Sequence, residues 1–178
     1  NEFAEFCDNF EVDVNKVIDA AASKPYGFMP FYPGLGAGGH CIPVDPLYLQ
    51  HTAEAIGSPL NFIKLAAEIN SKRPTYILNK VKNYLGVIKD KRILIVGIGY
   101  KPHIGDVRES PSVALIEILR SHGAIVKWND DFVKNWNGEE STKLVGIYDL
   151  VIISGDNFEL IRKNLKNSPL MNSLGQIL

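Results

Sequence analysis

The hydrophobic positions of this 178-residue chain follow a helical period up to residues 86–91 and form strand-like runs beyond them. Over residues 2–22, apolar residues recur every three or four positions with a break at residues 9–13, which predicts two helices. Asp13 stands at the start of the second helix, where its side chain is suited to cap it. A longer amphipathic pattern over residues 59–85 predicts a helix with one buried face.

Proline and glycine set the limits of the remaining elements in the first half. Residues 24–46 are rich in proline, glycine and aromatic side chains, so we expect a loop there. Pro46 is expected in the first turn of a helix that includes Ala55 and ends at Gly57. Within the long amphipathic pattern, Pro74 is expected to kink the helix or to start it anew.

The second half opens with a continuous apolar run at residues 92–97, as in a strand that is buried on both faces of a parallel sheet. A helix is expected after it, with Pro111 in the first turn and Gly123 beyond the end. Further strands are expected at residues 124–128 and 149–154. This order of strand, helix, strand and strand predicts an incomplete doubly wound lobe.

The predicted fold class is therefore α/β, with two domains. A helical domain is expected over residues 1–88, followed by an incomplete Rossmann-like domain with a parallel sheet over residues 89–178. Such sheets bind ligands at the carboxyl ends of their strands. Asp130 and Asp131 after the second strand, and residues 155–157 after the third, stand at those ends.

Composition and charge narrow the possible functions. Hydrophobic residues make up 46% of the chain and charged residues 22%, which is ordinary for a globular protein. The net charge of −1 comes without a basic stripe, which argues against nucleic-acid binding, and the apolar runs are too short to span a bilayer. The two cysteines, Cys7 and Cys41, do not suggest a disulfide framework, and no histidine and cysteine set has metal-site spacing. We therefore expect no metal, no membrane contact and a reducing, cytoplasmic setting.

The candidate chemistry lies in residues 33–46, PGLGAGGHCIPVDP. Their glycines let the backbone approach a ligand closely and present Cys41 on an uncrowded loop. A thiolate there is able to attack a carbonyl, and Asp45 is able to orient a water or accept a proton. The alternative is a buried cysteine in a tight turn. His40 is expected to shape the pocket rather than act as a base, because neighbours in an extended segment point to opposite sides.

A second glycine pair, at residues 97–99, follows the first predicted strand. The dinucleotide fingerprint needs a third glycine where Pro102 stands, so we do not expect a dinucleotide site here. The loop instead carries Lys101 and Arg108, whose cationic side chains suit an anionic ligand such as a phosphate. The alternative is a solvated loop in which Asp106 and Arg108 pair with each other.

Residues 33–45 resemble the signature loop PGxGxGG-x-C-x-x-x-D of the UDP-sugar 6-dehydrogenases, a family that oxidises the C6 alcohol of a hexose to a carboxylate with NAD. Tyr100 and Lys101, followed by DVRESP at residues 106–111, are similar to a second loop of the same family. His40 before the cysteine resembles the branch that acts on UDP-N-acetylhexosamines, mainly UDP-N-acetylmannosamine or UDP-N-acetylglucosamine. The UDP-glucose enzymes are the alternative.

The resemblance implies roles for residues of both loops. It implies that Cys41 is the nucleophile, that Asp45 assists hydrolysis, and that Arg108 reaches toward NAD. NAD itself is expected to bind mainly to an N-terminal domain outside this chain, so the chain alone is not expected to turn over. The residues implied to bind the UDP-sugar are Phe31, Tyr32, Gly38, Tyr100 and Lys101.

The resemblance also bears on assembly and on the end of the chain. It implies a homodimer through the helix of residues 59–85, which makes residues 1–88 a central domain of the dimerisation type. The family continues after residue 154 with a helix, a strand and a closing Asp-x-Arg or Asp-x-Lys stretch. We find no convincing closing stretch of this kind in residues 164–178.

Three functions remain open from the sequence. The first is part of an NAD-dependent UDP-sugar dehydrogenase, the second a UDP-sugar-binding module without catalysis, and the third a structural dimerisation unit. The aromatic residues before the glycines also fit ordinary packing. Arg73 fits either a subunit contact or a solvated charge.

Overall fold

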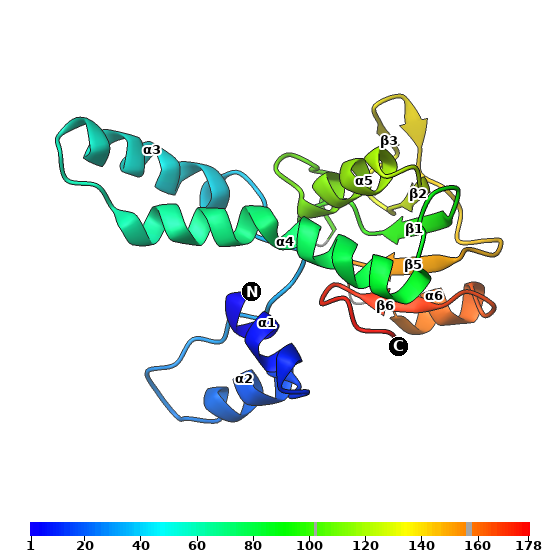
Figure 1. The fold of residues 1–178 in the computed structure, drawn as a ribbon, viewed down its shortest axis with the longest axis horizontal. Helices are drawn as coiled ribbons and strands as arrows, with labels where there is room; N and C mark the ends of the chain where they lie inside the picture. The colour runs from blue at the N-terminus through cyan, green and yellow to red at the C-terminus, as the bar shows by residue number, and fades with distance from the viewer. Residues whose placement is uncertain (102, 156–157) are drawn as a thin grey trace.

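Helices form the first half of the chain in the computed structural model, which describes residues 1–101, 103–155 and 158–178. α1 (Glu2–Asn9) and α2 (Val14–Ala22) make one pair, and α3 (Cys41–Ala55) and α4 (Asn61–Leu85) make another. Figure 1 shows α3 and α4 side by side as a hairpin that extends from the α/β lobe. Helix α1 contacts α4 through Glu5 and Asp8. The predicted break between the first two helices is confirmed, and Asp13 Oδ1 accepts a hydrogen bond from Asn15 N at 2.9 Å.

Helix α3 begins earlier than the sequence predicts. Its first residue is Cys41, so the loop ends at His40 and Pro46 lies inside the helix rather than in its first turn. Pro43 occupies the first turn, where an N–H would have no helical partner in any case. Pro46 is tolerated one turn later, although it cannot donate to the carbonyl of Ile42.

Helix α4 also differs from expectation, because it passes through Pro74 and does not restart there. Pro74 is buried in its middle, and the second half of the helix packs on the sheet. The tertiary contacts of α4 therefore outweigh the intrinsic cost of an internal proline.

The predicted parallel sheet is confirmed, with strand order β2-β1-β5-β6. Its strands are β1 (Arg92–Val96), β2 (Ile125–Asn129), β5 (Leu150–Ile153) and β6 (Leu170–Asn172). β1 pairs with β2 on one side and with β5 on the other. The first connection therefore adds a strand on one side of β1, and the later strands are added on its other side. The carboxyl ends of β1 and β5 form the switch point at which open α/β sheets bind ligands.

The end of the chain is more regular than expected. α6 (Phe158–Asn164) and β6 form a further helix and strand that the hydrophobic pattern did not indicate. Residues 164–178 contain no Asp-x-Arg or Asp-x-Lys, as expected. β6 has only three residues, too short for a recognisable period, and its pairing with β5 rather than its own pattern defines it. Asn172 Oδ1 then accepts from the N–H groups of Leu174 and Gln176, both at 3.0 Å, which turns the chain back toward β6.

A small hairpin was also not predicted. β3 (Asn135–Trp136) and β4 (Glu139–Glu140) pair antiparallel between β2 and β5. Glu139 accepts two hydrogen bonds from the guanidinium of Arg120 on α5 (Pro111–Ser121), which ties the hairpin to that helix. Two-residue strands leave no periodic signal in a sequence.

Helices cover both faces of the sheet. On one face α4 and α5 pack against β1 and β2, with a buried cluster that includes Ile77, Val81, Ile95, Leu115 and Leu119. On the other face α6 packs against β1 and β5 through Leu94, Val151, Ile153 and Ile161. The second half of α4 thus belongs to the core of the α/β lobe, which fixes the α3–α4 hairpin to it.

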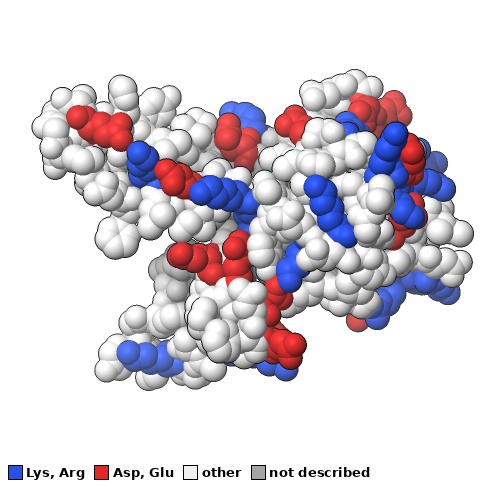
Figure 2. All heavy atoms as spheres, in the orientation of Figure 1, with Lys and Arg blue, Asp and Glu red and all other residues white. Residues whose placement is uncertain are grey.

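The surface shows no face dominated by one charge sign in the view of Figure 2, where acidic and basic side chains are interspersed. No described helix combines the length and the hydropathy that a membrane span requires. Phe3, Phe6 and Phe10 form an exposed aromatic row along α1, and Phe62 on α4 is 89% exposed.

Candidate active site

The two motif loops meet at Tyr100, although they lie far apart in the sequence. A Cβ on Gly38 would lie 2.5 Å from Cδ2 of Tyr100 and 2.8 Å from the carbonyl oxygen of Glu109. At Gly39, where φ is +84°, a Cβ would lie 2.3 Å from Cε1 of the same ring. Only glycine permits this approach, so the end of the glycine loop is packed onto the loop that follows β1.

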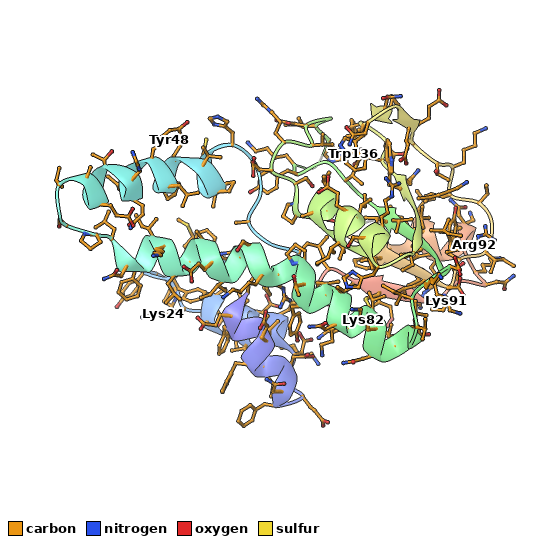
Figure 3. All side chains as sticks on the ribbon, turned by 45° about the horizontal axis from the view of Figure 1, so that its top comes forward. Lys24, Tyr48, Lys82, Lys91, Arg92 and Trp136 are labelled. Carbon is orange, nitrogen blue, oxygen red and sulfur yellow. The ribbon has the colours of Figure 1, made fainter. Side chains whose placement is uncertain are left out.

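Cys41 and Asp45 both lie on α3, not on a loop as predicted. They are separated by four residues and therefore face the same side of the helix, one turn apart. Both side chains are exposed, and Cys41 is a free thiol, which excludes the alternative of a buried cysteine. The C-x-x-x-D spacing is a helical one, and that signal would have predicted the helix had the two prolines not suggested a loop. Tyr48 lies on the same helix, further from the lobe (Figure 3).

The start of the glycine loop is fixed by polar contacts. The N–H of Gly34 donates to Asn1 Oδ1 at 3.0 Å, and its carbonyl accepts from Arg73 Nε at 3.0 Å. The side chain of Arg73 is only 1% exposed, so the interpretation of this residue as a solvated charge is wrong. Arg73 stands four residues from both Ile69 and Ile77 on the apolar face of α4, and this position could have indicated its burial.

The GxG of the second loop holds a carboxylate instead of a phosphate. Asp130 Oδ2 accepts from the N–H groups of Ile98 and Gly99 at 3.0 and 2.9 Å. Its Oδ1 accepts from Phe132 N and Val133 N at 2.8 and 3.0 Å. In a dinucleotide fold the backbone N–H groups after the first strand face the pyrophosphate, and here an internal anion already binds them. Asp130 at the predicted ligand-binding edge thus has a structural partner of its own.

Two neighbouring cavities lie along the carboxyl edge of the sheet. One, of about 230 Å³, is lined by Tyr100 and Lys101, and the other, of about 750 Å³, by Tyr32. Ser154 and Gly155 at the end of β5 line both, so the cavities adjoin. Of the segment expected at this edge, residues 156 and 157 lie outside the described residues.

The predicted substrate residues are only partly brought together. Tyr32 and Tyr100 line different cavities, Gly38 is buried beneath Tyr100, and Phe31 is 76% exposed and lines neither cavity. The hydroxyl of Tyr32 donates to Asp19 Oδ1 at 2.7 Å, and this hydrogen bond raises the pKa of Tyr32. A ligand in the larger cavity would meet this pair of side chains.

Arg108 and Asp106 pair with each other, as the alternative interpretation expected. Arg108 Nη2 lies 2.7 Å from Asp106 Oδ2, and Nε donates to Oδ1 at 2.9 Å. The Arg108 hydrogen bonds lower the pKa of Asp106 to about 2. The arginine side chain is 71% exposed, so a contact with NAD stays a prediction for this residue.

An apolar groove of about 930 Å³ lies next to the segment that contains Cys41 and was not predicted. Ala37 and Ile42, on either side of the Gly38–Cys41 segment, line it together with residues of α4 and α5. Ile42 follows Cys41 directly, so this groove and the thiol lie side by side. No group of three histidine, cysteine or acidic side chains suited to a metal occurs within residues 1–101, 103–155 and 158–178.

Comparison with known proteins gives matches over both halves of the chain. The UDP-glucose/GDP-mannose dehydrogenase family, central domain, matches residues 1–72, and the UDP binding domain of the same family matches residues 94–163. The chain is 35% identical over 172 residues to a UDP-N-acetyl-D-mannosamine dehydrogenase of Methanococcus maripaludis, covering 92% of this chain and 39% of the relative. It is 33% identical over 131 residues to UDP-glucose 6-dehydrogenase TuaD of Bacillus subtilis, covering 73% and 28% respectively.

Solved structures give the same match in three dimensions. The structure of a UDP-D-ManNAc dehydrogenase from Pyrococcus horikoshii superimposes with a TM-score of 0.78 at 25% identity, covering 97% of this chain and 43% of the other. The chain therefore spans between 28% and 43% of the length of these proteins. Relatives named for UDP-glucose and for UDP-N-acetyl-D-mannosamine match at similar identity.

Proposed function

Since this chain belongs to the UDP-glucose/GDP-mannose dehydrogenase family, we propose that it carries the nucleophile and the nucleotide-binding part of an NAD-dependent UDP-sugar 6-dehydrogenase. The observation that carries this proposal is the packing of Gly38 and Gly39 on Tyr100. Through that contact the loop that leads to Cys41 lies against the loop that bears Lys101. A thiol that follows one loop and a cation suited to phosphate on the loop packed against it fit a substrate activated by a nucleotide.

The UDP moiety is proposed to lie along the carboxyl edge of the sheet, through the two adjoining cavities. Lys101 supplies a positive charge for a phosphate, Tyr100 lines the same cavity, and Tyr32 lines the larger one. Phe31 is proposed to cover the ligand from the neighbouring position. This direction leads the sugar back toward the glycine loop, which Tyr100 contacts.

NAD is proposed to bind outside this chain. The backbone N–H groups that a dinucleotide would need after β1 donate to Asp130, so the described residues do not fit the cofactor by themselves. The two oxidations of the overall reaction need NAD, and we assign to this chain only the covalent steps. Arg108 is proposed to face the cofactor from the exposed surface of the loop that follows β1.

The covalent steps use Cys41 and Asp45. The Cys41 thiolate adds to the C6 aldehyde of the substrate, and the carbonyl oxygen takes up a proton to give a thiohemiacetal. After oxidation at C6, the adduct is a thioester. Water attacks its carbonyl carbon while Asp45 accepts the proton of that water, and the C–S bond breaks to give the uronic acid and the free thiol.

Among substrates we propose a UDP-N-acetylhexosamine such as UDP-N-acetylmannosamine, because His40 precedes the nucleophile. UDP-glucose is the second candidate, favoured by the similarity to TuaD. A homodimer through α3 and α4 is proposed as well, since Phe62 and other apolar side chains of that hairpin are exposed. We propose a cytoplasmic setting, where a nucleophilic thiol stays reduced.

A binding module without catalysis and a structural dimerisation unit are weaker proposals. Neither explains why an exposed thiol and an exposed carboxylate lie one turn apart on α3 at the end of an anchored loop. An exposed free thiol in a purely structural unit would be open to oxidation without benefit.

Calorimetric titration of the chain with UDP, UDP-N-acetylmannosamine, UDP-glucose and NAD tests the nucleotide part. We expect the UDP compounds to bind and NAD not to bind, with the tightest Kd for the preferred sugar. If none of the UDP compounds binds, the nucleotide assignment fails, and NAD binding would contradict the location proposed for the cofactor.

The covalent step has a separate test. A UDP-sugar with a 13C-labelled C6 aldehyde is added to the chain, and the 13C signal of C6 is followed by NMR. We expect a tetrahedral carbon bonded to sulfur in the wild type and only the aldehyde and its hydrate with Cys41→Ser. Equal spectra for the two proteins would contradict the role of Cys41.

A further inference from the structure

We propose that Arg73 is a positioning residue, which holds the start of the glycine loop and thereby determines where Cys41 is presented. The inference rests on the proposed function of Cys41 as the nucleophile. It concerns a residue of the central helix α4 that does not line any of the three cavities described above.

Arg73 joins three elements through one buried guanidinium. Its Nε donates to the carbonyl of Gly34 at 3.0 Å, and its Nη1 donates to Glu5 Oε1 on α1 at 3.1 Å. The guanidinium also lies over the ring of Tyr76, 4.5 Å from the centroid. The glycine loop, α1 and α4 therefore meet at this side chain.

Stability alone does not explain a charge in this position. Burying a guanidinium removes it from water, and an apolar side chain of similar size is often at least as stabilising. What an apolar residue cannot do is hold a backbone carbonyl in one place. The planar fork of arginine reaches two acceptors on different elements at fixed angles, which the single nitrogen of lysine does not reproduce.

Gly34, the residue that Arg73 holds, is fixed on both sides. Asn1 accepts from the N–H of Gly34 while Arg73 donates to its carbonyl, and Asn1 Nδ2 donates to Asn70 Oδ1 on α4 at 2.7 Å. The next residue, Leu35, is 4% exposed and belongs to the main core. The start of the glycine loop is therefore attached to α4 at a defined point.

The other end of the loop is fixed by the packing of Gly39 on Tyr100, two residues before Cys41. Arg73 anchors the loop to the central helices, and Tyr100 anchors it to the α/β lobe. The position of Cys41 depends on both anchors, because only six residues lie between it and Gly34. Release of the Arg73 anchor is expected to loosen the segment that carries the thiol without removing any residue that touches it.

The neighbouring ion pair offers a matched control. Lys80 pairs with Asp8, so it also joins α4 to α1 through a salt bridge, but it has no contact with the glycine loop. Lys80→Met removes such a pair and leaves Gly34 bound. Glu5→Gln removes the charge partner of Arg73 and keeps the bond from Nε to Gly34.

The test is a nitroxide label on Cys41 in the full chain, with its mobility measured by electron paramagnetic resonance. Cys7 is buried, and peptide mass confirms that the label is on Cys41. We expect Arg73→Met to increase the mobility of the label clearly, Arg73→Lys to increase it less, and Lys80→Met and Glu5→Gln to leave it unchanged. Thermal unfolding by circular dichroism checks that each variant is folded.

The proposal is overturned if folded Arg73→Met or Arg73→Lys gives the parent spectrum, or if Lys80→Met changes the spectrum as much as Arg73→Met. Arg73→Lys serves if Arg73→Met does not fold. UDP titration of the same proteins separates this inference from the proposed function. A mobile label in a chain that does not bind UDP supports the positioning role while the nucleotide assignment fails.

Discussion

The glycine loop of residues 33–40 and the loop that follows β1 both use glycine for close approach, but to different groups. In the first, Gly38 and Gly39 admit an aromatic ring from the other loop. In the second, the N–H groups of Ile98 and Gly99 bind the carboxylate of Asp130. The second motif therefore does not leave these N–H groups free for a pyrophosphate, as the similar motif of a dinucleotide fold does.

The comparison shows that glycine-rich loops in one protein have two different structural roles. Side chains from other elements hold the first loop, so that Cys41, the residue that follows it, is exposed at a defined place. Asp130 binds the backbone N–H groups of the second loop, so we propose that its side chains, such as Lys101, bind the ligand instead. Variants that remove one contact at a time test this comparison.

Gly39→Ala is expected to have the largest effect. The new Cβ would overlap the ring of Tyr100 at 2.3 Å, and a φ of +84° strains any residue other than glycine. We expect the free energy of unfolding to fall by about 3 kcal/mol or more, as judged by urea denaturation.

Gly57→Ala is the matched control for that variant. Gly57 also has a positive φ, of +74°, but a Cβ there meets nothing within 4 Å. We expect the free energy of unfolding of Gly57→Ala to fall by about 1 kcal/mol, from backbone strain alone. Equal losses at the two positions would show that the contact with Tyr100 does not matter.

Asp130→Ala should have the next largest effect. It leaves four backbone N–H groups without their acceptor, two in the second loop and two in the segment after β2, and unsatisfied groups of this kind cost about 2 kcal/mol of stability in total. The same denaturation experiment measures this loss. Asp131→Ala, at the next position, is the control and is expected to change little. If the two variants unfold alike, the second loop is not closed by Asp130.

The elements that the sequence predicted well are those with a long period. The amphipathic pattern of α4 and the apolar run of β1 each extend over enough residues to define an element. Pro111 and Gly123 marked the ends of α5 correctly, because capping depends on local chemistry.

What the sequence did not predict depends on contacts between distant segments. β6 is defined by its pairing with β5, and the start of α3 by a loop that is fixed at Gly34 and Gly39. The motif residues of the site were predicted from their resemblance to a known family. The carboxylate that accepts from the N–H groups of Ile98 and Gly99 was not predicted. Asp130 was noted only for its place at the sheet edge, since no local pattern links it to Ile98.

Lys101→Ala examines the ligand side of the second loop. Its side chain is exposed and lines the smaller cavity, so we expect unchanged stability and a Kd for UDP about tenfold weaker, from the loss of one charge-assisted hydrogen bond. Calorimetric titration measures the affinity. Lys127→Ala, on β2 and outside that cavity, is the control. Unchanged affinity in Lys101→Ala would remove this residue from the site.

The pH dependence of the Asp106–Arg108 pair should be the smallest effect, because both side chains are exposed and screened. The pair lowers the pKa of Asp106 to about 2, compared with about 3.9 in an unfolded chain. A lowered pKa in the folded state stabilises above the unfolded value, so the contribution is present above about pH 4 and is lost as the pH falls toward 2. The difference in unfolding free energy between the wild type and Arg108→Met should therefore shrink over that window, and it should also shrink in 1 M salt. A difference that stays constant from pH 5 to pH 2 would mean that Arg108 stabilises the second loop by packing rather than by its charge.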